Sequence, residues 1–278
     1  MKEKKMNTEK LYIGPIALKD MDANVRGEYV TRDKESYYKI SNFNGMAPFF
    51  MTIVSSSDHW LFISSNGAAS AGRKNPESAL FPYYTDDKII DSAKITGSKS
   101  MFRVKKDGKT YIWQTFSVRY VGIYEIKRNI YKNKTGNKII FEEINEDLQV
   151  SYQYMWTFSE RFGFVKKSIL TNLSNEPLEI EYLDGIRNIL PYGVASELQN
   201  SKSTLVDAYK KNERVDNSSI VLYRLSSLLT DKAEPAESLK ASSVWSCGVK
   251  DNKIFLSDKV LKEFRNGLLL NEVNGTRG

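Results

Sequence analysis

The stretch LQVSYQYMWTF, residues 148–158, decides the fold class. Its apolar and aromatic residues occupy every second position, namely Leu148, Val150, Tyr152, Tyr154 and Trp156. Successive side chains of a strand point to opposite faces, so this period of two predicts a β-strand with one buried face.

Short apolar runs on both sides of this stretch, bounded by Asn, Gly, Ser and Asp, predict further strands. They cover residues 37–43, 49–55, 60–64, 101–104, 111–116, 120–131, 138–142, 162–170 and 178–183. Asp107-Gly108 suits the positive φ angles of a tight hairpin turn, and residues 133–137 form a second turn. Trp60 begins an apolar strand and is predicted to point into the core. The chain is therefore expected to be mainly β, with an antiparallel meander.

The last third of the sequence changes character. Residues 194–214 have apolar positions near helical spacing, and Ser257-Asp258 can cap a helix that ends before Gly267. Residues 220–229 read as a strand, although their leucines also suit a helix. We expect a few short helices in this third of the chain. The predicted organisation is an N-terminal extension with the first strands at 1–30, a β-unit at 31–230, and a linker-like segment at 231–278 that looks cut from a longer chain.

Composition argues against several classes of function. The 278 residues carry a net charge of +7, but basic and acidic residues are interspersed, which favours a solvated surface over a nucleic-acid site. No apolar run is long enough to span a membrane, and residues 1–10 lack the apolar stretch of a signal peptide. A single cysteine, Cys247, fits a reducing compartment. These features predict a cytoplasmic protein that binds neither nucleic acid nor membrane.

The sequence offers little catalytic chemistry. His59 is the only histidine, and a structural role is favoured for it because Trp60 next to it begins an apolar strand. One histidine and one cysteine cannot build an ordinary Cys/His zinc site, and no nucleotide-binding glycine motif is present. Glu142-Glu143 and Glu146-Asp147 surround a turn and are predicted to be solvated. We therefore assign no catalytic residue, no metal site and no cofactor.

Residues 66–90, NGAASAGRKNPESALFPYYTDDKII, are predicted to form a long irregular excursion between strands. Long loops are uncommon unless they serve a function. Aromatic faces beside charged groups suit sugar rings, so Arg73, Tyr83, Asp86 and Asp87 are candidate substrate-binding residues for an oligosaccharide. The alternative is a loop that closes the end of a sandwich and uses its aromatic residues as plugs.

Two stretches carry a resemblance to known carbohydrate-active enzymes. Residues 60–90 resemble the N-terminal β-domain of cellobiose-phosphorylase-like proteins, in which an apolar strand leads into a loop with Gly, Arg and Asn and then a Pro-aromatic pair. The matching positions are Gly72, Arg73, Asn75, Leu80, Pro82, Tyr83 and Asp86. The family usually has Trp where this chain has Tyr83. Residues 168–182, SILTNLSNEPLEIEY, are similar to a strand-turn-strand of galactose-mutarotase-like super-sandwiches.

The resemblance implies an antiparallel super-sandwich of the galactose-mutarotase type. Such a domain would be a non-catalytic module of a glycoside phosphorylase-like or hydrolase-like enzyme, packed on a separate (α/α)6 catalytic barrel and able to support a homodimer. Two alternatives remain open. The chain could be a free-standing β-sandwich that binds a glycan or a protein, or a mutarotase-type enzyme, which the single histidine disfavours.

Overall fold

The computed structural model describes residues 9–19, 24–83, 86–227, 240–273 and 275–277. Within these ranges the chain is mainly β, and every strand pairing is antiparallel. The predicted fold class is confirmed at that level. No helix in the described ranges is both long and apolar enough to cross a membrane.

The largest sheet has six strands. Their order is β14 (Gly163–Asn172), β13 (Val150–Ser159), β12 (Ile139–Asn145), β11 (Ile126–Asn133), β4 (Glu35–Ser41) and β3 (Arg26–Arg32). The stretch at 148–158 forms the second strand from one edge, β13, and all five alternating residues are at most 3% exposed. The predicted turn at 133–137 connects β11 to β12.

Two smaller sheets come from the middle of the sequence. The first is a meander of β5 (Phe50–Val54), β6 (His59–Ser64), β7 (Ala69–Arg73) and β8 (Ala79–Phe81), and the second has the order β10 (Lys109–Gln114), β9 (Gly97–Lys106), β15 (Glu179–Arg187). Asp107 and Gly108 join β9 to β10 with φ angles of 51° and 70°, which confirms the predicted hairpin turn.

The C-terminal part builds another four-stranded sheet. Its order is β18 (Ser242–Trp245), β17 (Ile220–Leu225), β16 (Lys210–Arg214), β19 (Gly275–Arg277). Three short helices accompany it, α2 (Ser196–Ser201), α3 (Ser203–Tyr209) and α4 (Lys259–Arg265). A short hairpin of β1 (Tyr12–Ile13) and β2 (Ile16–Ala17) lies near the N-terminus.

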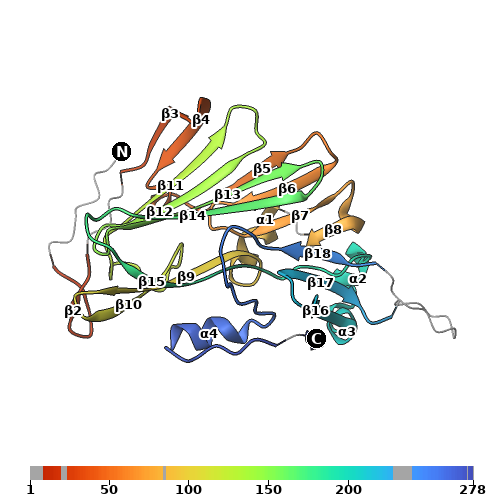
Figure 1. Cartoon of the computed structure of the whole chain (residues 1–278). Coiled ribbons are helices and arrows are strands. Elements are labelled where there is room, and N and C mark those ends of the chain that lie inside the picture. The colour runs from red at the N-terminus through yellow and green to blue at the C-terminus, as the bar shows by residue number, and fades with distance from the viewer. Residues whose placement is uncertain (1–8, 20–23, 84–85, 228–239, 274, 278) are drawn as a thin grey trace.

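The main apolar core lies between two layers of sheets (Figure 1). The six-stranded sheet and the β5–β8 sheet form one layer, and β9, β10 and β15 with the C-terminal sheet lie across from them. Helix α4 packs outside this second layer, where the Arg103 guanidinium lies 4.2 Å from the Phe264 ring centroid. Burial of the facing aromatic and branched side chains is the main stabilising term of such a fold.

Several features differ from the sequence predictions. The stretch at 66–90 is not an irregular excursion, since it holds β7, β8 and the short helix α1 (Asp86–Ile89). Helices are therefore not confined to the last third of the chain. The predicted boundary at 230 does not separate structural units, because β18 and β19 pair with β17 and β16. The boundary at 30 falls inside β3. Pro235 and the small polar residues around it also predict a loop at 232–243, and most of this stretch lies outside the described residues.

Two glutamates predicted to be solvated are buried. Glu142 is 8% exposed and Glu143 is 1% exposed. Glu143 lies between the layers, where it accepts hydrogen bonds from the Trp113 indole N–H and the Phe116 backbone N–H at 2.7 and 2.6 Å and pairs with Arg128. A buried carboxylate is tolerated when charged and polar partners surround it, which a strand pattern alone does not reveal.

Candidate functional site

Of the four residues predicted to bind substrate, the structure describes the surroundings of Arg73 and Tyr83. Arg73 ends β7 opposite His59, and Gly72 before it lies opposite Trp60. Because neighbouring residues of a strand face opposite ways, Arg73 lies on the His59 face of the sheet. The Tyr83 ring instead packs edge-on against Trp60, with ring centroids 5.9 Å apart.

The two predicted aspartates begin helix α1. The side chains of Asp86 and Asp87 lie outside the described structure, so their role in substrate binding stays a prediction. The structure thus gives a defined environment to Tyr83 and Arg73 only, and it does not bring these two together.

Trp60 does not point into the core as predicted. Its strand neighbours Leu61 and Ile63 are at most 1% exposed and belong to the core, whereas Trp60 is half-buried on the other face of the sheet. The strand is apolar on both faces, so its sequence did not indicate which face is covered.

A row of aromatic side chains follows this outer face. We call Phe50, Phe62, Trp60 and Tyr83 the aromatic row. Successive ring centroids in that order are 5.4, 5.1 and 5.9 Å apart. Phe50 is 38% exposed, and the other three rings are half-buried. The row therefore presents a partly exposed apolar surface at the outside of the sheet, with the rings tilted or edge-on to one another.

Gly72 makes room for the centre of the row. A Cβ atom at this position would lie 2.5 Å from Cζ2 of Trp60 and 2.9 Å from the Ser78 carbonyl oxygen. The indole can therefore lie directly over the β7 backbone only because residue 72 has no side chain. A glycine inside a strand often marks such a close approach, and this is the signal by which the site could have been found from sequence.

Polar groups border the aromatic row. Thr52 pairs with Phe62 in the sheet and shares its face. The Tyr83 backbone N–H donates to Oε1 of Gln199 at 3.1 Å, and the Gln199 amide in turn donates to the Val194 carbonyl. Helix α2 therefore fixes the chain that carries Tyr83. The arrangement offers aromatic faces for apolar contact and a nearby hydroxyl for hydrogen bonding.

His59 has structural contacts. Its ring stacks against Phe158 and meets Phe164 edge-on, and its Nδ1 lies 3.1 Å from the Ser57 hydroxyl. Burial, with the nearby charge of Arg73, lowers the pKa of His59 below 6.5. These contacts accord with the structural role favoured from sequence.

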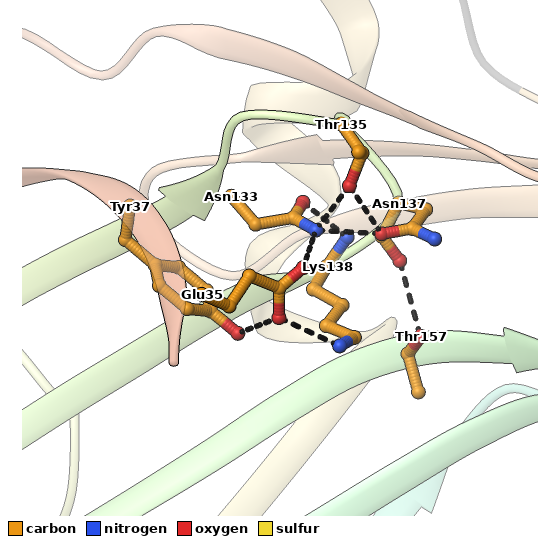
Figure 2. Close-up of polar contacts among 7 residues, drawn as sticks. All are labelled: Glu35, Tyr37, Asn133, Thr135, Asn137, Lys138 and Thr157. Carbon is orange, nitrogen blue, oxygen red and sulfur yellow. Dashed lines mark hydrogen bonds and ion pairs between the residues drawn. The ribbon is translucent and has the colours of Figure 1, made fainter. Parts of the chain in front are cut away.

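A polar cluster closes the β11–β12 hairpin against β4 (Figure 2). Glu35 accepts hydrogen bonds from the Asn133 amide at 2.7 Å and from the Tyr37 hydroxyl at 2.9 Å, and Lys138 pairs with it at 2.7 Å. The Asn133 amide also reaches Asn137 within the turn. These groups satisfy one another's hydrogen-bonding capacity, and their contacts hold the turn against the neighbouring strand β4.

Glu35 should make stability depend on pH. The hydrogen bonds from Lys138 and then Asn133 lower its pKa from 4.5 to about 2. A lowered carboxyl pKa means that the folded state favours the ionised form. The contribution of Glu35 to the free energy of unfolding is therefore complete above pH 4.5 and is lost as pH falls toward 2. We expect the difference in melting temperature between wild type and Glu35→Gln to shrink across this window. Glu28→Gln, at an exposed position of β3, is the control, and a difference that stays constant from pH 7 to 2 would contradict the assignment.

Comparison with known proteins does not assign the chain to a family. Neither the protein-family models nor the curated proteins contain a match to the chain. Within the described residues no group of three His, Cys, Asp or Glu side chains is placed to hold a metal ion. The partly exposed rings of the aromatic row make it a candidate site.

Proposed function

We propose that this chain is a non-catalytic, carbohydrate-associated β-sandwich module, and that the aromatic row binds a sugar. The row carries the proposal because its four neighbouring aromatic rings remain partly exposed on the outer side of the β5–β8 sheet. The C–H faces of pyranose rings are apolar and pack against aromatic faces, while their hydroxyl groups need hydrogen-bonding partners at the edge. Thr52 offers such a partner beside Phe62.

The proposal extends to the parent protein. We place the module in a glycoside phosphorylase-like or hydrolase-like enzyme of the cytoplasm, as a super-sandwich that supports a separate (α/α)6 catalytic barrel and its sugar site. A homodimer through this module is part of the same proposal. The resemblance of residues 60–90 and 168–182 supports it, and the aromatic row lies within and beside the first of these segments.

The aromatic row can be tested by removing its rings. Trp60→Ala and Phe62→Ala should each weaken the binding of cello-oligosaccharides to the 278-residue chain by about tenfold, because each loses a stacking partner. Isothermal titration calorimetry measures the affinity. Tyr29→Ala, at a 74% exposed position of β3, removes a ring elsewhere and should leave binding unchanged.

Melting temperatures of the same variants separate binding from folding. Because Trp60 is half-buried, Trp60→Ala is expected to remain folded at the temperature of the titration. Folded Trp60→Ala and Phe62→Ala variants with wild-type affinity would refute the aromatic row as a sugar site.

A further inference from the structure

A polar cluster that the aromatic row does not use lies between the two layers. We call Ser100, Tyr152, Lys166, Ser168 and Asp184 the rim cluster. One oxygen of Asp184, Oδ1, lies 2.5 Å from the Lys166 ammonium, 2.6 Å from the Ser100 hydroxyl and 2.8 Å from the Tyr152 hydroxyl. The Ser168 hydroxyl lies 3.2 Å from that of Tyr152. Four strands, β9, β13, β14 and β15, thus converge on one carboxylate.

The ion pair at the centre of the rim cluster is largely withdrawn from water. The side chain of Lys166 is 6% exposed and that of Asp184 is 21% exposed. Burial lowers the pKa of Lys166 against the opposing effect of Asp184. Burial acts to raise the pKa of Asp184, but Lys166 outweighs it and the pKa falls below 3.8. Asp184 is therefore an ionised carboxylate at neutral pH, with a fifth of its side chain accessible.

The rim cluster is accessible because the two layers end beside it. Strand β14 is an edge strand of the six-stranded sheet, and β15 is an edge strand of the three-stranded sheet β10-β9-β15. Leu170 pairs with buried Tyr152 and Tyr182 pairs with buried Phe102, so both side chains point toward the space between the layers. Leu170 is nevertheless 36% exposed and Tyr182 is 45% exposed, and Ser168 is exposed as well. Inward-facing side chains that remain exposed mark an open side of the sandwich.

Stability alone gives a weak reason for charges at this place. A buried ion pair costs desolvation, and replacing such a pair with apolar residues of similar size is often neutral or stabilising. The same interior also holds the Ser98 hydroxyl, which is buried without a hydrogen-bond partner among the described residues. Ser98 lies two residues before Ser100 on β9 and therefore shares its face. This face of β9 thus holds a buried hydroxyl group whose hydrogen-bonding capacity the described residues do not use.

We infer that the open side between β14 and β15 is a second binding site, for a sugar ring or another ligand with several hydroxyl groups. The Asp184 carboxylate would accept hydrogen bonds from ligand hydroxyl groups, the Ser168 hydroxyl would add a neutral partner, and the exposed Tyr182 ring would cover an apolar face. Lys166, Tyr152 and Ser100 hold the carboxylate in place and are positioning residues. The inference rests on the proposed carbohydrate-associated function and adds a site distinct from the aromatic row.

The test uses the 278-residue chain and cello-oligosaccharides in isothermal titration calorimetry. Tyr182→Ala should weaken binding at this site about fivefold, because the stacking ring is lost. Asp184→Asn should weaken it by about tenfold or more, because a charged acceptor is replaced by a neutral amide. Tyr38→Ala removes a ring of similar exposure, 43%, from β4 and should leave binding unchanged. The double variant Lys166→Met/Asp184→Leu replaces the ion pair with apolar groups and should fold while losing this site.

The outcomes separate this site from the aromatic row. Folded Tyr182→Ala and double variants with wild-type binding would overturn the second site, while a loss of binding in Trp60→Ala would still support the aromatic row. Loss of binding in the rim variants alone would support the second site and refute the row. Wild-type chain that binds no cello-oligosaccharide in the titration would overturn both.

Discussion

Replacing Glu143 with alanine is expected to lower the free energy of unfolding by about 3–5 kcal/mol. Glu143 is 1% exposed and accepts hydrogen bonds from Trp113 and the Phe116 backbone. It also pairs at 2.7 Å with Arg128, whose side chain is only 13% exposed. Without the carboxylate, the largely buried Arg128 guanidinium loses the ion pair that compensates its charge. Urea unfolding followed by circular dichroism gives the free energy.

Glu146→Ala provides the matched control. Glu146 lies three residues further along the chain and pairs with Lys127. The Glu146 side chain is 37% exposed and the Lys127 side chain is 48% exposed. An exposed pair contributes about 0–1 kcal/mol, so this variant should unfold nearly as wild type does. Equal losses for the two variants would show that Glu143 does not hold the layers together.

Trp156→Ala is expected to cost about 3–5 kcal/mol of stability, because it empties a large volume in the core. Trp156 is 1% exposed and meets Phe81 edge-on at 6.1 Å, so it joins the six-stranded sheet to β8. Trp60→Ala should cost less, about 1–3 kcal/mol, because the Trp60 ring is only half-buried. Chemical unfolding of both variants compares the two sites directly.

Trp156→Phe refines the comparison. The indole N–H of Trp156 is buried without a hydrogen-bond partner among the described residues. Phenylalanine keeps most of the apolar volume and removes this unpaired donor, so the loss should be clearly smaller than for alanine. A Trp60→Ala variant that is less stable than Trp156→Ala would contradict the placement of Trp60 on the outer face.

The sequence by itself determined the parts of this protein that depend on neighbouring residues. The period of two at residues 148–158 predicted β13 and its buried face, because alternation follows from the geometry of a single strand. Asp107-Gly108 predicted the β9–β10 turn, because both residues tolerate positive φ. The turn at 133–137 was likewise predicted from its local sequence, Asn-Lys-Thr-Gly-Asn between two apolar runs.

Local pattern was not enough where residues are small or a strand is apolar on both sides. Strand β7 consists of Ala, Ser, Gly and Arg and was predicted as part of an irregular excursion, since these residues lack the β-branched and aromatic signature of strands. Its first four residues are buried because the neighbouring elements pack tightly over them. Trp60 and Leu61 are both apolar, so only the packed layers decide that Leu61 faces the core.

Tertiary structure alone decided which residues meet in the two candidate sites and which charged side chains are buried. Tyr83 meets Trp60 across 23 residues of sequence only because the β5–β8 meander folds back on itself. Asp184 meets Ser100, Tyr152 and Lys166 only because β15 joins a different sheet from β14. Alternation along a strand shows which residues share a face. Whether that face meets water, an apolar layer or an opposite charge depends on the sheet that packs against it, and distant parts of the chain supply that sheet.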